Sequence, residues 1–180
     1  MMLTKDDIYK EIELIQACIT RMASNSFSMK GWHIGIITAL FAFFFNKDTI
    51  NTNIIFIIIA VVTLAFWYLD SYYLMLERKY RWKYAWVITN RVNQTTPTSD
   101  YLFDLNPDKM NMWEVNKESK AFKAAERTQK AAAANKNGLV QGWYRLMEVA
   151  NVMISNTMEV QYLFVFVISI LISLLMMFMC

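Results

Sequence analysis

Glycine, proline, cysteine and histidine are all scarce in this sequence, and each shortage excludes a class of protein. The 180 residues include four glycines, two prolines, two cysteines and one histidine. Phosphate-binding loops need clustered glycines, while thiol redox centres and metal sites need grouped cysteines or histidines. The sequence contains no glycine-rich phosphate loop, H-E-x-x-H, C-x-x-C or nucleophile elbow. We therefore expect no enzyme, no metal site and no cofactor.

Charge is also scarce, whereas long apolar runs are abundant. Charged residues make up 18% of the chain and hydrophobic residues 56%, and soluble proteins carry about 25% charged residues. A membrane span takes about 20 apolar residues. The block 162–180 is long enough by itself, and the blocks 31–45 and 54–69 form a matched hairpin around a short polar loop. The sequence predicts an all-α membrane protein of one domain with three transmembrane helices, at residues 28–45, 54–76 and 161–180.

Basic residues give these spans an orientation. Of the 18 lysines and arginines, only Lys47 lies in the loop 46–53. Lys and Arg concentrate on the cytoplasmic side of membrane proteins. Residues 1–27 and 77–160 are therefore predicted to be cytoplasmic, and the loop and the C-terminus to lie outside.

The predicted cytoplasmic part is helical and is built from long extensions of the spans. No glycine or proline interrupts residues 70–91, so the second span should continue beyond the membrane as a rod of roughly 35 to 40 residues. Asn106 followed by Pro107 predicts a helix start, and an alanine-rich helix should cover 115–134. An amphipathic helix from Leu139 should pack on the rod, or lie at the membrane, and lead into the last span. Flexible segments are expected around 93–106 and 135–138.

The N-terminal segment 4–26 predicts an amphipathic helix with a heptad seam. Thr4 and Asp7 match a capping box. The apolar residues of the seam follow a 4-3-4-3 spacing and are Ile8, Ile12, Ile15, Ile19 and Met22. A seam this short does not fix its partner. It packs either on the chain's own cytoplasmic helices or on another subunit.

The first span contains a possible helix-packing motif, and all three spans contain polar residues. Gly31 and Gly35 form G-x-x-x-G, which lets a helix of the same chain or of another subunit approach closely. His33, the only histidine, is expected at the interface or in a hydrogen bond. The candidates for a pore or gate are Thr38, Asp70, Ser169 and Ser173. The alternatives are serines bonded to their own backbone and, for Asp70, a surface acid one turn beyond the lipid.

Two basic clusters lie in the predicted cytoplasmic part. The first follows the second span and consists of Arg78, Lys79, Arg81 and Lys83; it predicts a headgroup anchor or a ligand site. The second lies on one face of the alanine-rich helix and consists of Lys120, Lys123, Arg127 and Lys130. This cationic stripe is either a solvated face or an anion site for a nucleotide or short oligonucleotide. In the latter case Trp113 and Phe122 would supply stacking surfaces.

Two stretches of the sequence resemble a known group of proteins. The first, NSFSMKGW at 25–32, opens the first span, and the second, FWYLDSYYLMLER at 66–78, closes the second. Together they resemble small bacterial membrane proteins of the SLATT-like or RipA-like group, which often occur in anti-phage operons, and most of all the Hailong-type transmembrane effectors. The resemblance covers residues 12–85 and the helix that leads into the final span.

The resemblance implies a homo-oligomeric, ligand-gated effector in the bacterial inner membrane. Such a protein would conduct ions or depolarise the membrane in abortive infection, under the control of a nucleotide or short nucleic-acid signal from a companion nucleotidyltransferase. Three spans are too few for a pore within one chain, so conduction requires an oligomer, for which we expect four subunits. The alternatives are a non-conducting membrane scaffold that recruits a cytoplasmic partner and a small transport accessory subunit.

Overall fold

The computed structural model describes most of the chain as helix. The described residues are 4–44, 52–95, 99–114, 117–135, 137–155 and 159–179, and they contain no strand, which confirms the all-α class. The elements in chain order are α1 (Lys5–Phe44), α2 (Thr52–Val87), the π-helical η1 (Ile88–Val92), the 3-10 turn η2 (Met110–Met112), α3 (Lys120–Ala134), α4 (Gly138–Met153) and α5 (Glu159–Met179).

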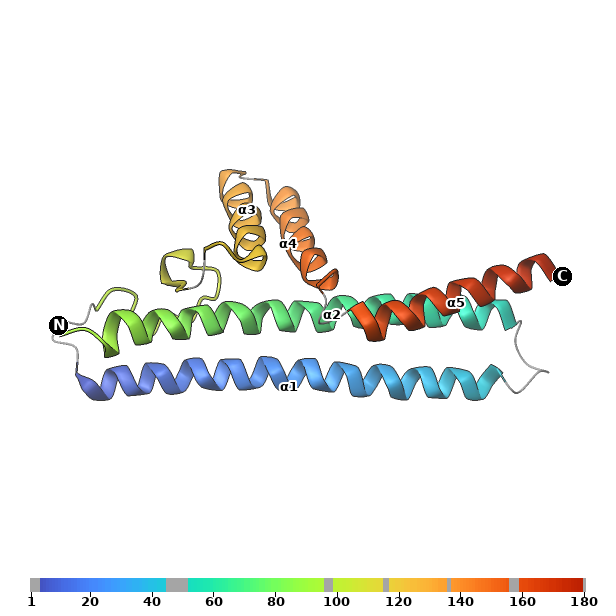
Figure 1. Cartoon of the computed structure of the whole chain (residues 1–180), viewed down its shortest axis with the longest axis horizontal. Helices are drawn as coiled ribbons and strands as arrows, with labels where there is room; N and C mark the ends of the chain where they lie inside the picture. Colours follow the sequence, from blue (N-terminus) through green and yellow to red (C-terminus); the bar gives the residue numbers. More distant parts are fainter. Residues whose placement is uncertain are drawn as a thin grey trace.

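Two very long helices, α1 and α2, lie side by side and antiparallel along the whole molecule (Figure 1). The capping box at the start of α1 is formed, since the Asp7 N–H donates to Thr4 Oγ1 at 3.2 Å and the Thr4 N–H donates to Asp7 Oδ2 at 3.1 Å. The predicted N-terminal helix and first span are one unbroken helix of 40 residues. The predicted rod is confirmed as the 36 residues of α2. The predicted external loop 46–53 lies outside the described residues up to 51, and α2 begins within it at Thr52.

The heptad seam of α1 packs on α2 of the same chain. Ile8, Ile15 and Met22 are buried, and Ile12 and Ile19 are half-buried. Met22 and its neighbour Cys18 form a core cluster with Tyr80 of α2. These contacts support the predicted packing on the chain's own helices, and they do not support the alternative in which Ile8, Ile12, Ile15, Ile19 and Met22 form a seam between subunits.

The helix α5 lies along the N-terminal part of α2 (Figure 1). There, Ile55, Phe56 and Ile59 of α2 pack against partly buried side chains of α1 and α5. The outward faces are apolar too: Val61 is 62% exposed. We call the C-terminal half of α1, the N-terminal half of α2 and α5 together the apolar end. Among the described residues, one helical stretch, Ile54–Val92 in α2 and η1, is long and apolar enough to cross a membrane, and a shorter apolar stretch, Tyr162–Leu175, lies in α5.

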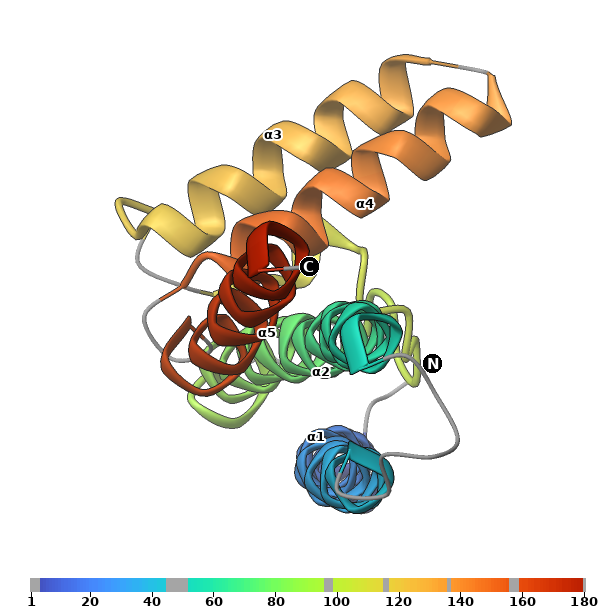
Figure 2. The same ribbon diagram turned by 90° about the vertical axis from the view of Figure 1, so that its right-hand side faces the viewer.

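The hairpin of α3 and α4 stands transverse to α2, on the side of α2 that faces away from α1, as both views show (Figures 1 and 2). Each helix starts at a side-chain cap: Ser119 accepts the Phe122 N–H at 3.2 Å, and Asn137 accepts the Leu139 N–H at 3.1 Å. The predicted alanine-rich helix thus begins at Lys120 and not at 115.

The predicted helix start at Asn106 is wrong. The Asn106 side chain accepts the Asp108 N–H at 3.0 Å, so these residues form a turn closed by an asparagine side chain. The segment 99–109 that contains this turn runs along α2, where Lys83 donates to the Asn106 carbonyl at 3.0 Å. Burial lowers the pKa of Lys83, and Asp104 opposes this shift.

Candidate functional site

A fully buried carboxylate, that of Asp70 in α2, lies between the three helices of the apolar end. Lys30 Nζ of α1 lies 2.7 Å from Asp70 Oδ2. The hydroxyl of Tyr162 in α5 donates to the same oxygen at 3.1 Å, and the hydroxyl of Ser26 in α1 donates to Oδ1. Lys30 also donates to Ser26 at 3.0 Å. We call these four residues the Asp70 junction.

Helical spacing explains why these residues meet. Ser26 and Lys30 are four residues apart, so they share one face of α1. Tyr162 is fully buried and lies in the first turn of α5. Asp70 is therefore neither a solvated surface acid nor an open pore carboxylate in this structure. It joins α1, α2 and α5 through one set of polar contacts.

A second polar layer lies one turn deeper in the apolar end. His33 is buried, and its Nε2 lies 3.1 Å from Thr63 Oγ1 of α2, which confirms that the histidine is hydrogen-bonded. The ring of Tyr162 packs between His33, with centroids 4.9 Å apart, and Trp67, which is stacked at 6.4 Å. These contacts fix the Tyr162 hydroxyl toward Asp70.

The contacts of the Asp70 junction depend on the relative positions of the three helices. A charged pair inside apolar surroundings is costly unless its partners are in place. A displacement of α5 would remove the Tyr162 hydrogen bond from Asp70, and a displacement of α1 would remove Lys30. The junction therefore favours one arrangement of the three helices and opposes intermediate ones.

The other predicted pore residues, Ser169, Ser173 and Thr38, do not share one face of the structure: the two serines are buried and Thr38 is exposed. Ser169 and Ser173 are buried within the chain, and Ser169 donates to the Val165 carbonyl of its own helix at 2.7 Å. The prediction that these two serines line a pore between subunits is therefore not supported by their position. Thr38 is exposed and bonds to its own helix, at Ile34, at 2.8 Å.

The glycines of the first span have no close partner among the described residues of the chain. No heavy atom lies within 4 Å of a Cβ built at Gly31 or Gly35, outside their own stretch of helix. Gly31, Gly35 and Thr38 share an exposed face of α1, which we call the glycine face. Packing against a helix of the same chain is thus excluded for the described residues. A contact with a second subunit stays a prediction.

Comparison of the chain with protein-family models, curated proteins and solved structures finds no match. The family resemblance therefore stays a prediction from two sequence stretches. The structure adds that these stretches meet: residues 25–32 contribute Ser26 and Lys30, and residues 66–78 contribute Asp70.

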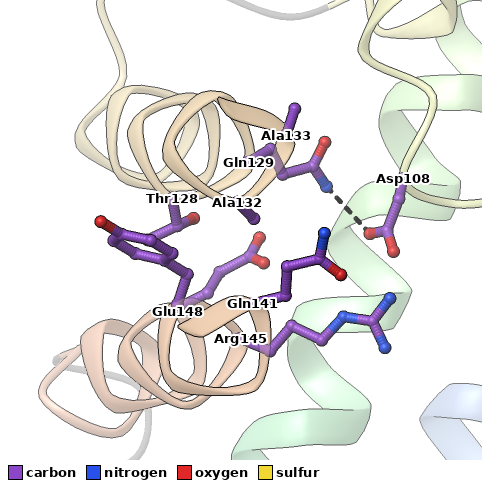
Figure 3. A pocket seen from close by; sticks show the side chains of 9 residues that line it. Asp108, Thr128, Gln129, Ala132, Ala133, Gln141, Arg145 and Glu148 are labelled. Atoms are coloured by element: carbon purple, nitrogen blue, oxygen red, sulfur yellow. Dashed lines mark hydrogen bonds between the residues drawn. The ribbon is translucent and has the colours of Figure 1, made fainter. Parts of the chain in front are cut away.

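A second ionic cluster holds the hairpin of α3 and α4 on α2. Lys79 is buried and lies 2.7 Å from Asp108 and 2.8 Å from Glu148 of α4. Gln129 of α3 donates to the same Asp108 oxygen at 2.9 Å (Figure 3). Burial raises the pKa of Glu148, and Lys79 opposes this shift. The prediction of a headgroup anchor fails for Lys79 and Lys83, because both side chains are buried by the protein.

Two cavities flank this cluster. One of about 220 Å³ lies between α3 and α4 and includes Gln141 and Glu148 (Figure 3). The other, of about 420 Å³, lies between α2, α3 and α4, with Met75 and Val152 as apolar lining. Its basic side chains are Arg78, Lys79 and Lys120. The larger cavity therefore combines cations with an apolar wall.

The cationic stripe itself is exposed on α3. Its members, Lys120, Lys123, Arg127 and Lys130, all face solvent. Only Lys120 also lines the larger cavity, and Lys130 pairs with Glu126 at 2.7 Å. The structure thus brings one of the four predicted cations to a cavity.

The predicted stacking surfaces are not accessible. Trp113 and Phe122 are 6% and 8% exposed and pack edge-on against each other and against Trp82 of α2. The Trp113 indole N–H donates to the Pro107 carbonyl at 3.0 Å. Their predicted role as stacking surfaces for a nucleotide is therefore wrong, because both rings pack between α3 and α2.

A third ionic contact, which the sequence did not predict, joins Glu11 of α1 and Arg91 of η1. Both side chains are fully buried, and the carboxylate accepts from Arg91 and from the Phe103 N–H. Arg91 also donates to the Asp100 carbonyl at 2.6 Å. A signal existed, since Glu11 falls on the seam face, three residues after Ile8.

Proposed function

We propose that the chain is a subunit of a homo-oligomeric membrane effector in a bacterial anti-phage system. In this proposal α1, α2 and α5 cross the inner membrane, with the N-terminus inside and the C-terminus outside. A nucleotide or short oligonucleotide, supplied by a companion nucleotidyltransferase, controls whether the assembly lets ions pass.

The Asp70 junction is the observation that carries the proposal. Ionisable residues within membrane-spanning helices are rare and mark functional positions. Here one such residue is held by side chains from both neighbouring helices, at the cytoplasmic border of the apolar end. A gate needs two discrete arrangements, and breaking or forming the contacts of Asp70 separates them.

Assembly is supported by the glycine face of α1. Gly31 and Gly35 leave a shallow, exposed strip with no partner among the described residues. Small residues at such positions let helices of two subunits approach closely. Because three spans do not enclose a pore, we expect a ring, with four subunits as the expected number.

The contacts of the α3–α4 hairpin with α2 and its short link to α5 support control of ion flux by a ligand that binds the hairpin. α4 is held to α2 by the ion pair between Glu148 and Lys79, and it ends only a few residues before α5 begins. A ligand shifts an equilibrium only if its affinity differs between the two states. A phosphate bound near Lys120, at the mouth of the larger cavity, would bias the position of α4 and thereby that of Tyr162.

The cationic stripe provides the test of this control. In proteoliposomes that contain an ion-sensitive dye, short single-stranded oligodeoxynucleotides are expected to change ion flux. Replacement of all four stripe cations (Lys120, Lys123, Arg127 and Lys130) by Gln should abolish that change. The slope of log affinity against log salt falls by about 0.7 for each lost phosphate contact of a single strand, so the variant should lose most of the salt dependence.

A matched control removes the same charge elsewhere, by replacing the exposed Lys5, Lys10, Arg21 and Lys117 with Gln. This control should retain binding and flux control. Equal affinity and equal salt slope for the parent and the stripe variant would show that the stripe is only a solvated face. Flux that no oligonucleotide changes, together with monomers alone in mass photometry, would contradict the channel and favour the non-conducting scaffold.

A further inference from the structure

The helix α4 carries a continuous apolar face that the described residues leave uncovered. Leu139 is 86% exposed and Trp143 61%. The whole face, which we call the α4 apolar face, consists of Leu139, Trp143, Leu146, Met147 and Ile154. These residues recur at helical spacing on one side of α4. An exposed apolar strip of this kind usually marks a contact with a membrane or another protein.

The opposite side of α4 is occupied. Gln141 and Glu148 line the cavity toward α3, while Val149 and Val152 pack with Met75 of α2. The ion pair between Glu148 and Lys79 fixes the rotation of α4 about its own axis. The α4 apolar face is therefore held away from α3.

The arrangement of the helices decides what the α4 apolar face meets. The hairpin lies across the long helices, with α4 on the side of the apolar end and α3 on the far side (Figure 1). Seen from the apolar end, α4 lies in front of α3 and runs transverse to the long helices, on the side of α2 that faces away from α1 (Figure 2). If the apolar end crosses the bilayer, α4 runs along the membrane surface and its apolar face points toward the lipid.

We infer that α4 is an in-plane interfacial helix whose apolar face rests among the headgroups of the cytoplasmic leaflet. Helices of this kind combine an apolar face carrying Trp or Leu with a polar face turned to water, and tryptophan prefers the membrane interface. The α4 apolar face ends at Ile154, and α5, which belongs to the apolar end, begins at Glu159. The inference rests on the membrane insertion in the proposed function, but not on conduction, defence or the ligand.

Depth-dependent quenching tests this placement on the full-length protein. Single cysteines replace Trp143, Leu146, Lys123 or Val61 in a background without Cys18 and Cys180, and carry an environment-sensitive fluorophore. Each variant is reconstituted in vesicles with lipids spin-labelled near the headgroup or near the end of the acyl chain. At 143 and 146 we expect blue-shifted emission and loss of most intensity to the shallow quencher. The label at 61 should be quenched mainly by the deep one, and the label at 123 by neither.

Labels at 143 and 146 that behave like the label at 123, while 61 is still quenched, would overturn the inference and leave the membrane-spanning proposal intact. Blue-shifted labels at 143 and 146 that neither lipid quenches would show that protein, such as a second copy, covers the face; this also overturns the inference. An unquenched label at 61 would contradict membrane insertion itself, and the inference would fall with it.

Discussion

Replacement of Asp70 by Ala is expected to destabilise the protein by about 3 kcal/mol. Removal of one partner from a buried ion pair leaves the other without compensation in an apolar environment. Here the buried Tyr162 hydroxyl loses its acceptor, and Lys30, whose side chain is 33% exposed, loses its partner, so the cost lies at the low end of the range for buried pairs. For a chain of this size the midpoint of thermal unfolding should fall by roughly 6–12 °C. Tryptophan fluorescence of the detergent-solubilised protein measures this change.

Two variants control this result. The pair Asp70→Leu and Lys30→Met should recover most of the loss, because apolar residues of similar size can replace a buried ion pair at little cost. Asp6→Ala changes an exposed acid of α1 and should leave the midpoint unchanged. If the Asp70→Ala variant unfolds at the parent midpoint, the Asp70 junction does not hold the three helices together. If the double variant has the parent's stability but passes ions whether or not an oligonucleotide is present, the Asp70 junction is the gate.

Replacement of Glu11 by Ala is expected to have a comparable or larger effect, at the other end of the molecule. Both Glu11 and Arg91 are fully buried, so the cost of leaving Arg91 unpaired is about 3–5 kcal/mol. Glu11 and Arg91 also hold segment 99–109, in which Tyr101 and Phe103 have φ values of 61° and 58°. Bulky residues adopt such conformations only when their surroundings impose them.

The expected result for Glu11→Ala is a fall of the unfolding midpoint by roughly 6–20 °C, with faster amide exchange in segment 99–109. Glu13→Ala is the matched control, because Glu13 lies in the same turn of α1 and is exposed. It should change neither quantity. Unaltered exchange in segment 99–109 of the Glu11 variant would contradict the role of this ion pair.

The sequence predicts the helices well because local rules determine them. The absence of glycine and proline from residues 70–91 permits the long α2, and the Thr4–Asp7 box starts α1 as expected. The partner of the α1 seam did not follow from the sequence, since a short apolar repeat shows which face is buried and not which helix covers it. The false helix start at Asn106 has a similar cause, because turns closed by asparagine and helix caps use the same residues.

The candidate site was less predictable, because its charged residues are paired between helices that are distant in the sequence. Lys30 and Asp70 each fit an interfacial position when considered alone, and nothing in the sequence links residues 40 apart. The predicted stacking role of Phe122 beside the cationic stripe could have been excluded from the sequence. At about 100° per residue, Phe122 lies roughly 200° around α3 from Lys120, so it could not share the face of the stripe. Trp113, which precedes α3, has no such periodicity to place it.

We propose that α1, α2 and α5 cross the membrane around the Asp70 junction, and thiol labelling in intact cells tests this arrangement most directly. Three variants each retain one cysteine: Asp48→Cys in the predicted external loop, Lys123→Cys on α3, and the native Cys180 with Cys18 replaced by Ala. We expect an impermeant thiol reagent to label positions 48 and 180 from outside, and position 123 only after the membrane is permeabilised. Labelling of position 123 alone in intact cells, or of Cys180 only after permeabilisation, would contradict the three-span arrangement.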